Sequence, residues 1–173
     1  ADLKVGQVKW LDKGKSSETI RITRKRSKTE HHIDVPEVTY TLWPETAALL
    51  TAFRSSNSVD DEDRWAMTSK GKPLVQEELR DGEAKRCDNI KSAYVRLLTK
   101  MGIPQDKETR KLFQLKLIRK TSSSTLEKHP VFGRYANHFL ADSPRSIPDS
   151  HYVVPDQKNF DDALEWLRQQ VLF

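Results

Sequence analysis

The segment LKLIRKTSSSTLEKHPVFGRYANHFLADSPRSIPDSHY, residues 115–152, decides the interpretation of this chain. Residues three and four apart on a helix are neighbours, so a helix at the start of the segment places Lys116 and Arg119 on one face. Two stacked cations repel each other, and a bound anion removes that repulsion. The small side chains of Ser122 and Ser123 leave room for such an anion beside Arg119. The pattern therefore indicates either an anion site or an ordinary solvated basic face.

Length and composition predict one folded domain over residues 1–173 with a core of its own. The net charge of +5 and the sequence pI near 9.3 fit a polyanionic partner but do not require one. Cys87 is the single cysteine, so an internal disulfide is excluded, and without a Cys/His cluster we expect no metal site. The simplest interpretation of Cys87 is a small, partly buried thiol.

Hydropathy gives no sign of membrane insertion. No apolar run approaches the roughly 18 residues that a spanning helix needs, and no signal peptide is visible. We therefore expect a cytoplasmic protein without a membrane partner. Residues 1–3 begin abruptly within an element, so we also expect a fragment that is truncated on its N-terminal side.

Strand patterns precede residue 43. Residues 19–23 alternate branched and charged side chains, and residues 32–35, extended by 38–42, predict a returning strand. The basic connection at 24–29 is either a solvated turn or a surface that meets DNA. We expect a mainly α protein with one small antiparallel β-sheet near the N-terminus, around residues 18–42.

Helical patterns dominate the rest of the chain. We expect helices at 44–53, 88–101 and from Asp156 to the end, with Gly102 terminating the second. Each carries an apolar stripe, and we assign that of the first helix to the core. The stripes are Thr46, Leu49, Leu50 and Phe53; Ile90, Ala93, Tyr94, Leu97, Leu98 and Met101; and Phe160, Ala163, Leu164, Leu167 and Val171.

The order of motifs resembles the tyrosine recombinases, also called the phage-integrase family. A K-x-x-R helix at 116–119 is followed by an F-L-x-x-S-P-R turn at 139–145 and a His-Tyr pair at 151–152. Residues 42–46, 71–74 and 89–103 also look like that family's catalytic domain. The resemblance implies an α+β catalytic domain that binds double-stranded DNA. It would break and rejoin a strand through a 3′-phosphotyrosine, as in recombination and integration of mobile elements, without a cofactor or metal.

The resemblance also implies roles for individual residues. Tyr152 would attack the scissile phosphate, Arg119 would clamp its nonbridging oxygens, and Lys116 would stand at the position of the family's usual His. Lys28 would protonate the leaving 5′ oxygen from the basic hairpin, with Lys25 as the alternative. The residues expected to bind DNA are Lys25, Lys28, Lys116, Arg119 and Arg145.

Three departures from the family keep other functions open. The first of the family's two arginines lies upstream of the match, Lys116 replaces His, and Ala141-Asp142 stands where the family has Gly-His. We therefore expect weak or no cleavage by this chain. The alternatives are a DNA-binding relative in which Tyr152 is only a core phenol, and a helical interaction module whose basic charge is incidental.

The expected surroundings follow from the same resemblance. A DNA-binding protein of this kind would be associated with the nucleoid if its source is bacterial. The last helix would either dock on a second copy of the chain on DNA or fold back on its own core.

Overall fold

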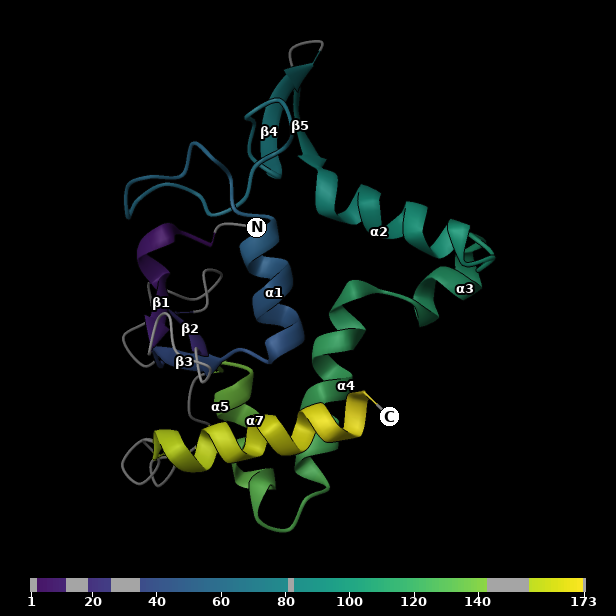
Figure 1. Ribbon diagram of the computed structural model, residues 1–173. Coiled ribbons are helices and arrows are strands. Elements are labelled where there is room, and N and C mark those ends of the chain that lie inside the picture. Colours follow the sequence, from purple (N-terminus) through teal and green to yellow (C-terminus); the bar gives the residue numbers. More distant parts are fainter. Residues whose placement is uncertain (1–2, 12–18, 26–34, 81–82, 143–155, 173) are drawn as a thin grey trace. The chain divides into compact units, whose positions relative to one another are not determined.

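The computed structural model describes residues 3–11, 19–25, 35–80, 83–142 and 156–172 (Figure 1). The chain divides into two compact units. We call Ala1–Gly6 with Leu49–Ile118 the Trp65 unit, and Gln7–Ala48 with Arg119–Phe173 the sheet unit. This division does not test whether residues 1–173 form the single domain predicted from the sequence, which stays a prediction.

A three-stranded antiparallel sheet forms one part of the sheet unit. The 3-10 turn η1 (Val5–Gln7) leads into β1 (Val8–Leu11), which pairs with β2 (Thr19–Arg24), and β2 pairs in turn with β3 (Val38–Thr41). Ile22 of β2 lies opposite Tyr40 of β3. This confirms the small antiparallel sheet near the N-terminus within a mixed α/β chain. Of the strand expected at 32–35, only Val35 is described, and it is buried just before β3.

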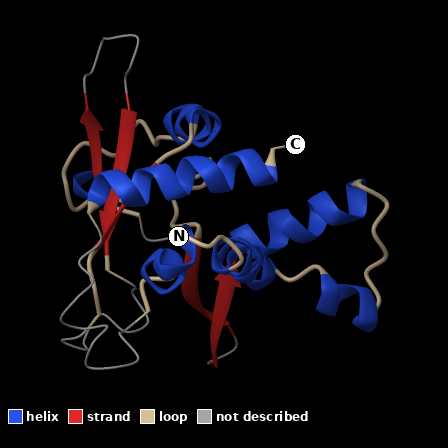
Figure 2. Ribbon diagram, turned by 90° about the horizontal axis from the view of Figure 1, so that it is seen from below, coloured by secondary structure: helices blue, strands red, loops and turns tan. Residues whose placement is uncertain are grey.

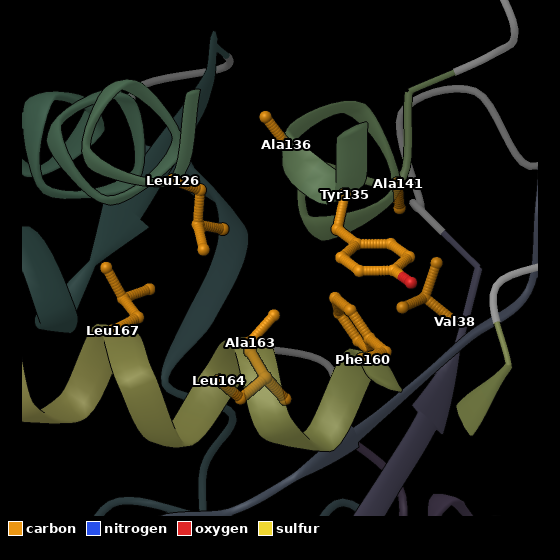
Figure 3. Packing of buried hydrophobic residues seen from close by; sticks show 9 residues of the cluster. All are labelled: Val38, Leu126, Tyr135, Ala136, Ala141, Phe160, Ala163, Leu164 and Leu167. Atoms are coloured by element: carbon orange, nitrogen blue, oxygen red, sulfur yellow. The ribbon is translucent and has the colours of Figure 1, made fainter. Parts of the chain in front are cut away.

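Helices supply most of the core of the sheet unit. They are α4 (Leu115–Glu127), the 3-10 turn η2 (Phe132–Tyr135), α5 (Ala136–Phe139) and α7 (Gln157–Val171), whereas α1 (Pro44–Ala52) buries none of its residues. Figure 3 shows Phe160, Ala163 and Leu167 pointing from α7 toward the side chains that complete the core. The buried cluster comprises Val38, Leu126, Tyr135, Ala136, Ala141, Phe160, Ala163, Leu164 and Leu167.

The last helix begins where the sequence predicts. The carboxylate of Asp156 accepts a hydrogen bond of 3.0 Å from the backbone N–H of Asn159, which satisfies one of the free donors at the helix start. Four of the five expected stripe residues are buried, and Val171 alone is exposed. The stripe is therefore used by the core of its own chain.

Polar contacts fix α7 to the sheet. Arg21 of β2 donates to Asp161 at 2.7 Å, and the hydroxyl of Thr41 donates to the other oxygen of the same carboxylate at 2.7 Å. The indole N–H of Trp43 donates to the carbonyl of Leu164 at 2.9 Å. These bonds set the direction of the helix, whereas the apolar cluster supplies area removed from water.

Trp65 is the most deeply buried large side chain of its unit. Its indole N–H donates to the carbonyl of Leu50 at 2.8 Å, and its backbone N–H donates to Leu3 at 2.7 Å. Downstream, β4 (Val75–Arg80) and β5 (Glu83–Asp88) form a two-stranded hairpin that runs directly into α2 (Asn89–Lys100), as Figure 1 shows. The short helix α3 (Lys107–Leu112) follows.

The boundary signals of α2 are confirmed. The carboxylate of Asp88 accepts a hydrogen bond from the backbone N–H of Lys91 at 2.9 Å, as an N-cap does. Gly102 follows the C-cap with φ of 76°, in the left-handed region that a residue without Cβ adopts at no steric cost.

The core assignment of α1 is wrong, and the apolar stripe of α2 is largely exposed. In α1, Leu49 is 60% exposed, and just beyond it Phe53 is 70% exposed. In α2 only Leu98 is buried, while Leu97 and Met101 of the same stripe are exposed. Figure 2 colours the strands and the helices; along the chain α2 directly follows the two-stranded β4–β5 hairpin, and such a hairpin offers little area for a helix to cover. An apolar stripe predicts an amphipathic helix, not the presence of a partner.

Among the described helices, none is long and apolar enough to cross a membrane.

Candidate functional site

Helix α4 carries both cations of the K-x-x-R motif. The helix forms as predicted, and Leu126 and Ser123 are the residues it buries. Lys116 is exposed, and the Arg119 side chain is 43% exposed. Ser123 faces the buried side, so the expectation that it leaves open space for an anion beside Arg119 is wrong. The reason is that burial of Leu126 turns the neighbouring Ser123 inward as well.

A turn at the end of α5 faces the same arginine. Its first element is a C-terminal cap in which the N–H of Ala141 donates to His138 at 2.8 Å and the N–H of Asp142 donates to Asn137 at 3.2 Å. These two bonds have the spacing of a Schellman motif. Ala141 takes the left-handed conformation of that motif, with φ of 47°, at a position usually held by glycine. The cap fixes the backbone from which the Asp142 side chain projects.

Asp142 and Arg119 form an ion pair. An Asp142 carboxylate oxygen lies 3.7 Å from a guanidinium nitrogen of Arg119, with the two side chains 27% and 43% exposed. A carboxylate beside a bound phosphate is electrostatically unfavourable unless it is neutral or turned away. The Asp142 carboxylate lies beside the arginine that would bind the phosphate.

Tyr40 connects the sheet to this turn. Its hydroxyl donates a 2.9 Å hydrogen bond to the carbonyl of Phe139, and its ring packs edge-on against the rings of Phe139 and Phe160. Burial raises the pKa of the Tyr40 phenol to about 12, although the guanidinium groups of Arg119 and Arg24 act to lower it. The phenol is therefore a protonated donor at ordinary pH and not a candidate nucleophile.

The imidazole of His138 lies against an aromatic ring. It packs edge-on against Phe160 with the ring centres 4.8 Å apart, and burial lowers the pKa of the imidazole. Burial therefore disfavours the charged form of His138.

The end of β2 supplies two further cations. Arg24 is the last residue of the strand, and Lys25, which follows it, is exposed. Lys25 thus follows β2, the central strand of the sheet, and β2 pairs with β3, which carries Tyr40. The remaining predicted residues, Lys28, Arg145 and Tyr152, lie outside the described residues.

The sequence interpretation missed two features of the site. Tyr40 was assigned only to a strand, and the C-terminal cap that Asp142 completes was not predicted. The alternation of β3 signals an inward-facing position for Tyr40, but no local pattern signals its bond to Phe139, a residue far along the chain.

The part of the chain with described coordinates contains no group of three or more His, Cys, Asp or Glu side chains that could hold a metal ion. No protein-family model, no curated protein and no solved structure matches the chain.

Proposed function

We propose that this chain is a DNA-binding domain of the tyrosine-recombinase type, which breaks and rejoins a DNA strand through Tyr152. The observation that carries the proposal is the contact between Arg119 and Asp142. These residues belong to the two separate motifs on which the resemblance rests, the K-x-x-R helix and the turn before the His-Tyr pair. A phosphate site built from both motifs requires them to lie together, and they do.

The backbone of the turn gives further support. The family has glycine where this chain has Ala141, and Ala141 adopts a left-handed conformation that favours glycine. A turn of the family's kind at this position therefore accounts for a conformation that alanine alone would rarely adopt.

The proposed reaction needs no metal or cofactor. The phenol of Tyr152 gives up its proton to water, its oxygen attacks the scissile phosphorus, a bond forms between them, and the bond from phosphorus to the 5′ oxygen breaks. Arg119 and Lys116 offset the charge that builds on the phosphate oxygens. Lys28 gives its proton to the leaving 5′ oxygen. Rejoining is the reverse, with a 5′ hydroxyl as the attacking group.

The same ion pair favours a second candidate, a DNA-binding relative without cleavage activity. Asp142 partly neutralises the arginine that would clamp the phosphate, and the chain contains only one of the two arginines that the resemblance implies. Such a protein would contact DNA through Lys25, Lys116 and other surface cations, and Tyr152 would have no chemical role.

Self-association through the last helix is a narrower part of the proposal. Most of the α7 stripe is buried in its own unit, which leaves Val171 and Leu172 as the exposed apolar residues at its end. A second copy could use only this end without unfolding the core.

A covalent adduct tests the proposal. The chain is incubated with a nicked suicide duplex in the presence of a chelator and then run on a denaturing gel. We expect slow formation of a protein–DNA adduct that is lost in Tyr152→Phe, while DNA affinity changes by less than about twofold, because a neutral hydroxyl adds little to phosphate binding. An adduct that persists in Tyr152→Phe would exclude this nucleophile. DNA binding without any adduct would favour the second candidate, and failure to bind duplex DNA at low salt would refute both.

A further inference from the structure

We propose that Asp142 is a built-in competitor of the DNA phosphate for Arg119, an autoinhibitory contact that lowers both DNA affinity and cleavage. The inference deepens the function proposed above and rests on it. A carboxylate and a phosphate both bind a guanidinium group through oxygen atoms. Each can accept two parallel N–H···O hydrogen bonds from it, so the two anions compete for the same donors. In the free protein the carboxylate of Asp142 is already beside Arg119.

The competitor is held in place by the turn. Three hydrogen bonds fix its backbone: Ala141 N–H to His138, Asp142 N–H to Asn137, and the Tyr40 hydroxyl to the Phe139 carbonyl. The carboxylate is thus presented to Arg119 from an ordered cap. The short Asp142 side chain therefore loses less conformational entropy on pairing than a long side chain would, and the entropy cost of the pair falls mainly on Arg119.

The pair is also open enough to be displaced. Arg119 keeps 43% of its side chain exposed, so an approaching phosphate can reach the guanidinium without unfolding the turn. Binding then has two routes. Either the phosphate displaces the carboxylate, or the carboxylate stays and repels the phosphate, and both routes weaken binding relative to a chain with a neutral residue at this position.

The experiment is a double-mutant cycle on DNA affinity at one fixed salt concentration. Asp142→Asn keeps the shape and removes the charge, and Asp142→Ser serves as a second variant. Asp162→Asn is the matched control, because Asp162 is an exposed carboxylate on α7 paired with Lys158. We expect Asp142→Asn to bind duplex DNA about tenfold more tightly, as removal of one unfavourable charge at a phosphate contact would allow. Asp162→Asn should change affinity by less than about twofold.

The Arg119→Gln background separates competition from general repulsion. If Asp142 acts by occupying Arg119, Asp142→Asn should no longer raise DNA affinity once Arg119 is replaced by Gln. In that background its effect on affinity should be as small as that of Asp162→Asn. An equal tenfold gain in both backgrounds would overturn the inference, because it would mean repulsion of DNA without the ion pair. The inference would also be overturned if Asp142→Asn gave no gain in DNA affinity in the parent chain, which keeps Arg119.

A small anion makes the test independent of DNA. Inorganic phosphate should raise the melting temperature of Asp142→Asn more than that of the unmodified chain, and this difference should vanish in Arg119→Gln. If the chain fails to bind DNA but shows this phosphate effect, the proposed function falls and the competitor contact stands. If DNA is bound but neither affinity nor phosphate stabilisation changes in Asp142→Asn or Asp142→Ser, the competitor inference falls alone.

Discussion

The hydroxyl of Tyr40 donates a hydrogen bond of 2.9 Å to the carbonyl of Phe139, and so joins strand β3 to the last residue of α5. The carbonyl is at a helix end, where backbone acceptors lack intrahelical partners. The remaining carbonyls of this short helix accept from Leu140, Ala141 and Asp142. The Tyr40 bond therefore completes the hydrogen bonding of the turn that carries Asp142.

Tyr40→Phe should lower the free energy of unfolding by about 1–2 kcal/mol, because the Phe139 carbonyl then lacks its partner. Urea unfolding measures this, with Tyr94→Phe in the other unit as the control. The folded pKa of about 12 lies above the ordinary value of 10, so the stabilisation is present below pH 10 and is lost as pH rises toward 12. The difference between Tyr40→Phe and the parent should shrink over that interval. A difference that grows there would contradict this account of the phenol.

Leu167→Ala should destabilise the sheet unit by about 2–5 kcal/mol, since the side chain is 1% exposed within the cluster and its removal leaves a cavity. Val171→Ala on the exposed end of α7 is the matched control and should change stability by less than about 0.5 kcal/mol. Thermal unfolding and sedimentation measure stability and assembly together. An unchanged melting curve with loss of an oligomer in Leu167→Ala would mean that the stripe serves a second copy and not its own core.

Glu45 in α1 and Arg168 in α7 form a two-bond ion pair at 2.6 and 3.0 Å. The hydrogen bonds from Arg168 hold the pKa of the Glu45 carboxyl below its ordinary value. The pair therefore adds stability above the unfolded pKa of Glu45, and this is lost as pH falls through the lower folded pKa. Melting temperature measured against pH should show a steeper acid loss for the parent than for Glu45→Gln. Parallel curves would show that the pair adds nothing in solution.

Lys116→Ala should weaken DNA binding to a similar degree for every sequence and reduce the slope of log affinity against log salt by about one, because one phosphate contact releases its counterion. Fluorescence anisotropy at several salt concentrations measures this slope. Lys158→Ala, which removes an exposed lysine paired with Asp162, is the control and should leave the slope unchanged. Equal slopes for the parent and both variants would remove Lys116 from the DNA surface.

The sequence was most informative where a pattern depends on nearby residues. The starts of α2 near Asp88 and of α7 near Asp156, the end of α2 at Gly102 and the strand at 19–23 are as predicted. Each of these results depends on a few residues in one stretch, and local geometry determines them.

The sequence was least informative where a partner is distant or lacking. The hairpin of β4 and β5 escaped prediction, although Asp81-Gly82 between two strand-like runs is a recognised hairpin signal. The exposed face of α1 was assigned to the core because an apolar stripe does not show what covers it. The contact of Arg119 with Asp142 could not be derived from either motif alone, since it depends on how α5 ends.

Burial of Trp65 has a consequence for spectroscopy. It is the single tryptophan in Ala1–Gly6 and Leu49–Ile118, whereas Trp10, Trp43 and Trp166 all belong to the sheet unit. An indole 1% exposed is shielded from water, and unfolding of its surroundings shifts its emission to longer wavelength. Fluorescence of a Trp65→Phe variant would come from the sheet unit alone, and subtracting it from that of the parent would leave the signal of the other unit. The chain thus carries built-in optical reporters for the melting of its two halves.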